Sequence, residues 1–262
     1  MVSYLQAFLL AIIQGITEWL PVSSSAHLAI TQQLLGISPP VIFDILLHGG
    51  TLFAVLIYFR NDLFALFSGF LTFNPKNQQF QYCIFIVVAS IPTAIIGFLF
   101  HDFFADMFSN LFFVAIALII TGIILYSTRF QNSKINEKSK LNFPIAFIIG
   151  IAQGFAVAPG ISRSGVTISS GLFAGLNRET AARFSFLISI PALVGAGLVE
   201  FIGKPLTIDL LGPSLFGACV AAVIGYLSIG FLLDIIRKGH FSIFAYYCWF
   251  VALVVIILQL LS

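Results

Sequence analysis

The sequence predicts an all-α polytopic membrane protein with six transmembrane helices and two re-entrant helical hairpins in an inverted repeat. The composition, the positions of the Lys and Arg residues, and a similarity between two regions of the chain support this prediction. Of the 262 residues, 60% are hydrophobic and only 8% are charged, whereas a soluble domain carries about 25% charged residues. So few charges cannot cover a packed core of this size, which excludes a soluble domain.

Six apolar runs are long enough for helical spans of about 20 residues, and they lack the short alternation of an outer-membrane barrel. The predicted spans cover residues 41–58, 83–100, 111–127, 181–202, 214–233 and 241–261. A further run, 63–73, is too short to cross and is expected to lie along the membrane surface. Residues 4–37 and 143–177 fit poorly as spans, because each combines an apolar helix, a polar break and a second, mixed helix.

The Lys and Arg residues set the orientation. Most fall on one side of the predicted spans: Arg60, Lys76, Arg129, Lys134, Lys138, Lys140, Arg237 and Lys238. Lys204 alone falls in the opposite loops. The positive-inside rule makes the basic side cytoplasmic. The sides alternate correctly only if 4–37 and 143–177 each return to the side from which they entered, so both are predicted to be re-entrant hairpins.

The two odd regions also resemble each other at a constant spacing. The matches are Gln14-Gly15 with Gln153-Gly154, Ser23 with Ser162, Ser25 with Ser164, and Gly36 with Gly175. Each half then holds one hairpin and three spans, and an odd number of crossings inverts the second half. A single membrane domain, 1–262, is therefore predicted to consist of inverted halves at about 1–130 and 140–262, with a site near the midplane.

The first hairpin carries polar groups that are costly at membrane depth unless they face a cavity or a partner. Gln14 and Glu18 are four residues apart and share one helix face. Pro21 breaks the helix, and the serines that follow include candidate N-caps for the next helix. Ser24 and His27 are three apart, so a hydroxyl and an imidazole can cooperate on one helix. The polar set is Gln14, Glu18, Ser23, Ser24, Ser25 and His27.

The second hairpin has a Pro-Gly break before a run of hydroxyls around Arg163. Arg163 is permanently charged and offers a planar fork of donors, with Ser162, Ser164 and Thr167 beside it. The free N–H groups at a helix start favour an anion. Two such starts facing each other with one Arg between them predict a phosphate site.

Structural interpretations stay open beside these functional ones. The hydroxyls can simply bond the preceding turn or a neighbouring helix, and Arg163 can form a structural ion pair with Glu18. His48 lies inside a predicted span, where it either lines the cavity or is a packed, hydrogen-bonded histidine.

The two polar motifs resemble the two signatures of the undecaprenyl-diphosphate phosphatases, the bacitracin-resistance family. The motifs are Gln14-xxx-Glu18 with Leu20-Pro21-Val22-Ser23-Ser24-Ser25-Ala26-His27, and Pro159-Gly160-Ile161-Ser162-Arg163-Ser164-Gly165-Val166-Thr167. Residues 43–51 and 182–187 also look like family segments, so the resemblance covers essentially the whole chain. Two departures are Gln14, where some members have Glu, and Ser25-Ala26, where many have Thr-Gly.

The resemblance implies six spans with two re-entrant hairpins in the bacterial cytoplasmic (inner) membrane. It also implies hydrolysis of undecaprenyl diphosphate to the monophosphate and inorganic phosphate, which recycles the lipid carrier for cell-wall synthesis. The active site is then expected to face the periplasmic, outer side, with activity supported by Mg²⁺ or another divalent cation such as Ca²⁺. Bacitracin would compete indirectly by binding the substrate.

The expected roles combine the resemblance with phosphoryl-transfer chemistry. Ser24 is the expected nucleophile and His27 its proton acceptor, which later protonates or activates water. Glu18 would hold Mg²⁺ with Gln14 as a neutral ligand, or would orient His27. The expected phosphate clamp consists of Ser23, Ser25, Ser162, Arg163, Ser164 and Thr167. Two rival schemes stay open, namely a phosphohistidine at His27 and a metal-activated water with no covalent step.

The expected partners are the polyprenyl diphosphate substrate and membrane lipid. No nucleic acid is expected, because the chain has no basic cluster with interleaved aromatic residues. A homodimer stays open. A transporter or flippase of the polyprenyl phosphate carrier is the alternative function, because inverted repeats with midplane anion sites are typical of transporters.

Overall fold

The computed structural model describes residues 2–108, 110–130, 140–201 and 208–261, and this part of the chain is helical with no strands. The helices are α1 (Tyr4–Thr17), α2 (Ser24–Leu34), α3 (Val41–Tyr58), α4 (Arg60–Phe70), α5 (Gln78–Leu99), α6 (His101–Phe108), α7 (Leu111–Ser127), η1 (Thr128–Phe130), α9 (Phe143–Phe155), α10 (Arg163–Phe173), α11 (Arg178–Phe201), α12 (Ile208–Arg237), η2 (Phe241–Ile243) and α13 (Phe244–Leu261).

Six of these segments are long and apolar enough to cross a membrane. They include α3, α5, α11 and α12, together with α7 extended through η1 and α13 preceded by η2. Large apolar side chains such as Phe98 and Leu260 are exposed on their outer faces, as expected for helices surrounded by lipid. The predicted all-α polytopic membrane protein with six spans is confirmed.

Local capping signals set where several helices begin. Ser3 and Gln6 form a capping box at the start of α1. Asn77, Asn110 and Asn142 each accept backbone N–H groups at the starts of α5, α7 and α9. These side chains satisfy N–H groups that have no partner within the helix, so polar residues mark the ends of the apolar segments.

The main difference from the predicted spans is at α12, which runs over Ile208–Arg237 rather than 214–233. Pro213 lies inside this helix, close to its start, where its missing N–H disturbs few backbone bonds. At the other end, Asp234 and Arg237 continue the helix as an ion pair three residues apart, with 3.9 Å between Oδ1 and Nη1. The helix therefore extends beyond its apolar stretch at both ends.

The short run predicted at 63–73 is α4. It follows α3 after a break at Phe59 and packs against the start of α5. A side chain at Gly69 would meet Cβ of Gln79 at 2.3 Å, so the two helices approach closely there. The position of α4 along a membrane surface stays a prediction.

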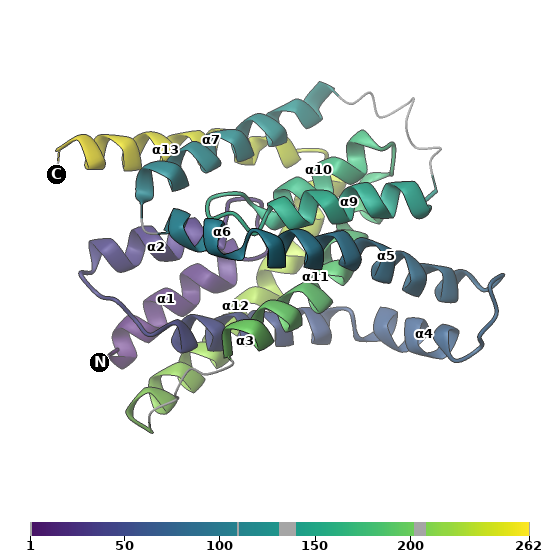
Figure 1. Ribbon diagram of the computed structural model, residues 1–262, viewed down its shortest axis with the longest axis horizontal. Coiled ribbons are helices and arrows are strands. Elements are labelled where there is room, and N and C mark those ends of the chain that lie inside the picture. Colours follow the sequence, from purple (N-terminus) through teal and green to yellow (C-terminus); the bar gives the residue numbers. More distant parts are fainter. Residues whose placement is uncertain (1, 109, 131–139, 202–207, 262) are drawn as a thin grey trace.

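The two odd regions are both helix–turn–helix pairs, α1–α2 and α9–α10. Their first helices, Tyr4–Thr17 and Phe143–Phe155, are apolar but short. α1 packs along α12, and α9 packs along α5 in the same manner (Figure 1). The re-entrant path of both pairs and the inverted relation of the halves stay predictions, and this exchanged packing is what two inverted halves would produce.

The helix ends lie in two groups, one toward each end of the long axis of the molecule. α1 begins and α13 ends at one end, whereas α4 and the end of α7 lie at the other (Figure 1). The membrane orientation predicted from the basic residues stays a prediction. Lys134, Lys138 and Lys204 lie outside the described residues.

Glycines allow the closest helix contacts. A Cβ on Gly50 of α3 would lie 2.2 Å from the carbonyl oxygen of Ala218 on α12, and a Cβ on Gly150 of α9 would lie 2.2 Å from that of Ala89 on α5. Small residues at such contacts let helix backbones approach in a lipid environment, where the hydrophobic effect gives little drive for association.

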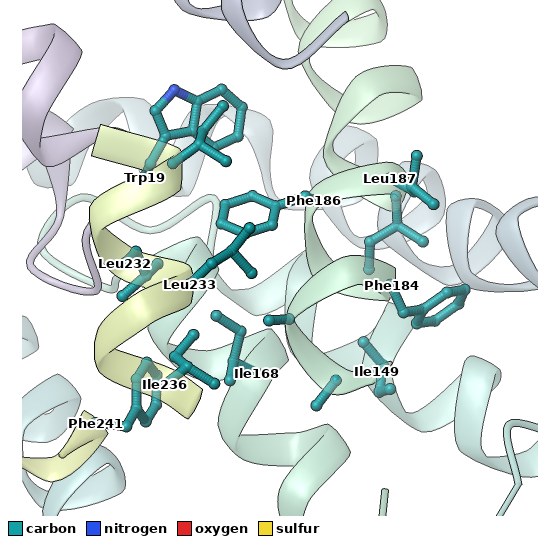
Figure 2. Packing of buried hydrophobic residues seen from close by; sticks show 14 of the residues in the cluster. Trp19, Ile149, Ile168, Phe184, Phe186, Leu187, Leu232, Leu233, Ile236 and Phe241 are labelled. Atoms are coloured by element: carbon teal, nitrogen blue, oxygen red, sulfur yellow. The ribbon is translucent and has the colours of Figure 1, made fainter. Parts of the chain in front are cut away.

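A buried apolar cluster fills the space between the second hairpin, α11 and α12. Trp19 lies at one end of the labelled residues and Phe241 at the other, with Ile168, Phe186 and Leu233 between them (Figure 2). Trp19 is completely buried and its ring meets that of Phe186 edge-on, with centroids 5.5 Å apart. The cluster therefore fixes the turn of the first hairpin against α11.

We expect Gly50→Ala to destabilise the protein, because the added methyl group overlaps a backbone carbonyl that cannot move without shifting α12. Overpacking of this kind costs about 1–3 kcal/mol. Gly49→Ala is the matched control, because a Cβ there meets nothing within 4 Å. Thermal unfolding in detergent should show a lower midpoint for Gly50→Ala only. Equal midpoints for the two variants would contradict the close packing of α3 on α12.

Candidate active site

The starts of α2 and α10 carry corresponding residues of the two hairpins. Ser23 caps α2 by accepting the N–H of Ala26, and Ser162 caps α10 by accepting the N–H of Gly165. Ser24 and Arg163 are then the first residues of the two helices. The φ angle of Ser23 is +69°, a left-handed conformation that is uncommon for serine and marks a tightly constrained turn.

The two helix starts are joined by reciprocal hydrogen bonds. Ser25 Oγ accepts the N–H of Gly160 at 3.4 Å, from the break before α10. Ser164 Oγ donates to the carbonyl oxygen of Leu20 at 3.2 Å, in the break before α2. Each serine thus reaches into the opposite hairpin. The structure brings together the two helix starts that the sequence predicts to face each other.

Glu18 is the centre of the site, and its carboxylate is buried. Arg163 Nη2 donates to Glu18 Oε1 at 2.6 Å. Ser24 Oγ donates to Glu18 Oε2 at 2.7 Å, and Gln14 Nε2 donates to the same oxygen at 3.1 Å. One carboxylate therefore connects a hydroxyl group with a guanidinium group. Arg163 thus forms the ion pair with Glu18 that the sequence allows as a structural alternative.

The ion pair does not use all the hydrogen-bond donors of Arg163. Its guanidinium group lies over the Trp19 ring, with Cζ 5.1 Å from the ring centroid, which adds a cation–π attraction. Its Nη1 is buried and has no hydrogen-bond partner among the described residues. A buried donor without a partner is unfavourable, so this nitrogen is available to a ligand oxygen.

The other hydroxyls of the predicted clamp have structural partners. Ser162 and Ser164 lie 3.3 Å apart at their Oγ atoms. Thr167 donates to the carbonyl oxygen of Arg163 at 2.7 Å, and its Oγ1 lies 2.6 Å from Ser185 Oγ on α11. Ser23 Oγ and Ser25 Oγ are 3.1 Å apart. These groups build the two helix starts, and their direct contact with phosphate stays a prediction.

The predicted hydrogen bond between Ser24 and His27 is not formed. His27 Nδ1 lies 2.8 Å from the carbonyl oxygen of Ser23, and His27 Nε2 lies 2.9 Å from the hydroxyl of Tyr247. Both ring nitrogens are thus engaged, while Ser24 donates to Glu18. The spacing of three residues places His27 near Ser24, but the break between Thr17 and Ser24 turns Glu18 back toward the hydroxyl.

His48 lies beside the carboxylate and is hydrogen-bonded within its own helix, and a role in lining a cavity stays a prediction. Its Nδ1 is 2.8 Å from the carbonyl oxygen of Asp44, and its Nε2 is 3.6 Å from Glu18 Oε2. Thr51, one turn further, accepts from Gln14 at 3.4 Å and donates to the carbonyl oxygen of His48 at 3.0 Å. α3 therefore holds Gln14 and Glu18 from one side.

His101 lies apart from this site. Hydrogen bonds that the protonated imidazole donates to the carboxylates of Asp102 and Glu200 raise its pKa. These contacts tie α6 to the end of α11.

Three residues of the site are not predicted from the sequence. Trp19 directly follows Glu18, and its position inside a polar motif could have indicated that it belongs to the site. Thr121 on α7 donates to the carbonyl oxygen of Gly160 and accepts the N–H of Ser162, but its local sequence is uniformly apolar. Tyr247 lies in an apolar span, 220 residues from His27, and no local pattern marks it.

Within the described ranges, no three His, Cys, Asp or Glu side chains form a metal-binding group. The predicted pair, Glu18 and Gln14, is brought together, and Gln14 Oε1 is buried without a hydrogen-bond partner in the part of the chain that the structure covers. An amide oxygen in this state beside a carboxylate is a possible ligand for a hard cation.

These features define a polytopic membrane protein whose few buried charges meet where two helix starts face each other. Residues 7–254 match the family described as bacitracin resistance protein BacA, and the chain belongs to this family. The resemblance carried by the two motifs is thereby confirmed.

Close relatives carry the name undecaprenyl-diphosphatase. The protein from Halothermothrix orenii is 44% identical over 259 residues, which cover 95% of each chain. The protein from Methanosphaera stadtmanae is 42% identical over 275 residues, covering 99% of each chain. The protein from Syntrophotalea carbinolica is 44% identical over 253 residues, covering 94% of this chain and 95% of the relative.

We expect Glu18→Gln to lower the free energy of unfolding by about 3–5 kcal/mol, because it leaves the charge of Arg163 buried and unpaired. Asp62→Asn is the matched control, since it breaks an ion pair with Arg183 whose side chains are 31% and 45% exposed, and such pairs contribute less than about 1 kcal/mol. Denaturant titration in mixed micelles measures both. A loss for Glu18→Gln no larger than that for Asp62→Asn would show that the buried pair does not stabilise the fold.

Proposed function

We propose that this protein is an integral membrane phosphatase that hydrolyses undecaprenyl diphosphate to undecaprenyl phosphate and inorganic phosphate. The observation that carries the proposal is the Glu18 carboxylate, which accepts the hydroxyl proton of Ser24 while it holds Arg163. A nucleophile, its base and a cation are thus in contact. The names of the relatives support hydrolysis over the alternative of carrier transport without chemistry.

In the first step, Ser24 Oγ attacks the terminal phosphorus and its proton passes to Glu18 Oε2. The bond from this phosphorus to the bridging oxygen breaks, and undecaprenyl phosphate leaves with its electron pair. The transition state carries charge on the phosphoryl oxygens, which the free Nη1 of Arg163 can bind. An ordinary carboxylate suffices as the base, because little bond formation to the nucleophile precedes cleavage.

In the second step, water attacks the phosphoserine and gives a proton to His27. The Ser24 oxygen leaves phosphorus and takes back its proton from Glu18, inorganic phosphate is released, and His27 gives the proton that it took from water to the solvent. This scheme differs from the sequence-based one in a single assignment. Glu18 rather than His27 takes the proton of Ser24, because the hydroxyl points to the carboxylate at 2.7 Å.

Mg²⁺ fits this donor set. Glu18 and the unpartnered Gln14 Oε1 would hold the ion, with phosphate oxygens and water completing the six ligands that Mg²⁺ prefers. When bound, the ion would neutralise charge on the diphosphate. Glu18 is the sole carboxylate available for this purpose in the motif, so Ca²⁺, which tolerates more varied ligand sets, is a second candidate.

We further propose that the protein lies in the cytoplasmic membrane with the site facing the outer side. Both proposals follow from the distribution of the basic residues and the family resemblance. Bacitracin would then compete for the lipid diphosphate from outside. A homodimer is compatible with this arrangement but is not needed to complete the site, because Glu18, Ser24 and Arg163 come from one chain.

The first test is phosphate release from a long polyprenyl diphosphate by purified protein in detergent, with Mg²⁺, with Ca²⁺ and with a chelator. We expect Ser24→Ala to lower kcat by more than about a hundredfold, and Arg163→Lys to lower it by about a hundredfold. Ser169→Ala is the control, because this buried hydroxyl on α10 is outside the site. Absence of release by folded wild type under every condition would overturn the proposal.

The second test is the covalent intermediate. If His27 activates water, His27→Ala should accumulate phosphoserine at Ser24, and mass spectrometry of a quenched reaction would locate the phosphoryl group. A phosphoryl group on His27 of the wild type would favour the phosphohistidine scheme instead. No phosphoenzyme in either protein during turnover would favour direct attack by water.

A further inference from the structure

Tyr247 of α13 contacts the proposed catalytic histidine from a distant part of the chain. Its hydroxyl is 2.9 Å from His27 Nε2. The two rings are stacked with centroids 5.6 Å apart and planes inclined by 6°. Tyr247 is 44% exposed, so this contact lies on the open side of the histidine.

The hydrogen bonds decide the tautomer of His27. A carbonyl oxygen can only accept, so Nδ1 must carry the proton that is donated to Ser23. A neutral imidazole has one N–H, and Nε2 is therefore the acceptor of the Tyr247 hydroxyl. The Ser23 carbonyl thus selects Nε2 as the nitrogen that can later take a proton, and the tyrosine hydroxyl donates to that nitrogen.

Neighbouring residues fix Tyr247 relative to the first hairpin. The thiol of Cys248 is buried and lies 3.6 Å from the carbonyl oxygen of Pro21. Trp249 Nε1 donates to the carbonyl oxygen of Ile119 on α7 at 3.2 Å. α13 is thereby held against both α7 and the hairpin break, so the position of the tyrosine hydroxyl is set by packing.

We propose that Tyr247 is a positioning residue, which fixes the ring plane of His27 and holds its Nε2 as a hydrogen-bond acceptor for the hydrolysis of the phosphoserine. This inference rests on the proposed function. For His27 to take a proton from water, Nε2 must exchange the tyrosine hydroxyl for that water. The exposed tyrosine therefore holds the Nε2 lone pair on its hydroxyl, where water can take the place of that hydroxyl.

The test is a pair of matched variants measured in the full-length protein. Tyr247→Phe removes the hydroxyl and keeps the stacked ring. Tyr246→Phe is the control, because the Tyr246 ring packs on Tyr126 and Trp249 and its hydroxyl makes no hydrogen bond within the described residues. We expect Tyr247→Phe to lower kcat by about tenfold, in the range measured for coupled neighbours, with KM unchanged and Tyr246→Phe at the wild-type rate.

Two further measurements separate positioning from general stability. In a His27→Ala background, Tyr247→Phe should cause no additional loss, because the tyrosine acts through the histidine. In protein labelled with ¹⁵N-histidine, Tyr247→Phe should shift the Nε2 resonance of His27, whereas Tyr246→Phe should not. The His27 signal is assigned by its loss in His27→Ala.

An equal loss of activity in the two backgrounds, or an unchanged Nε2 resonance, would overturn the proposal. The spectrum does not depend on turnover. If the wild type released no phosphate, the proposed function would fail, and the resonance would still decide whether Tyr247 holds His27.

Discussion

The buried ion pair between Glu18 and Arg163 is the interaction on which the rest of the site depends. Two charges removed from water are costly unless they are paired and hydrogen-bonded. Arg163, Ser24 and Gln14 together satisfy the carboxylate, and Trp19 covers the guanidinium. Because these partners come from both hairpins, the hairpins can dock in only one register without leaving a charge unpaired. The same pair positions a hydroxyl beside a base.

The surrounding helices hold the residues around this ion pair in place. Gly50 and Gly150 let α3 and α9 approach their neighbours closely, and the apolar cluster beneath Trp19 leaves that ring no room to turn. Thr121 bonds both sides of the break at Gly160. Among the described residues, Arg163 Nη1 and Gln14 Oε1 are buried atoms of the site that have no hydrogen-bond partner, and Gln153 Oε1, Ser169 Oγ and Ser214 Oγ are further such atoms elsewhere. The two atoms of the site lie where a phosphate and a cation are proposed to bind.

Local rules account for what could be predicted from the sequence. Hydropathy identifies the spans, and the breaks at Pro21-Val22-Ser23 and Pro159-Gly160 identify the two helix pairs. Because a buried charge needs a partner, an ion pair between Glu18 and Arg163 is one of the interpretations that the sequence allows. The partner of Ser24 could not be predicted, because a spacing of three relates residues within one helix, whereas Glu18 lies before a break whose turn sets its direction. The contact of His27 with Tyr247 depends on how α13 packs, which no local pattern encodes.

The two helix starts share a serine cap but differ at the residue that follows it. A serine caps each helix, and the next residue is Ser24 in one and Arg163 in the other. Two identical chains meeting about a symmetry axis would present two hydroxyls or two guanidinium groups to the carboxylate, never one of each. A single polypeptide that carries both helix starts allows one to differ from the other. The Glu18 carboxylate therefore meets a hydroxyl group on one side and a guanidinium group on the other, so a site built between two similar helix starts is not symmetric.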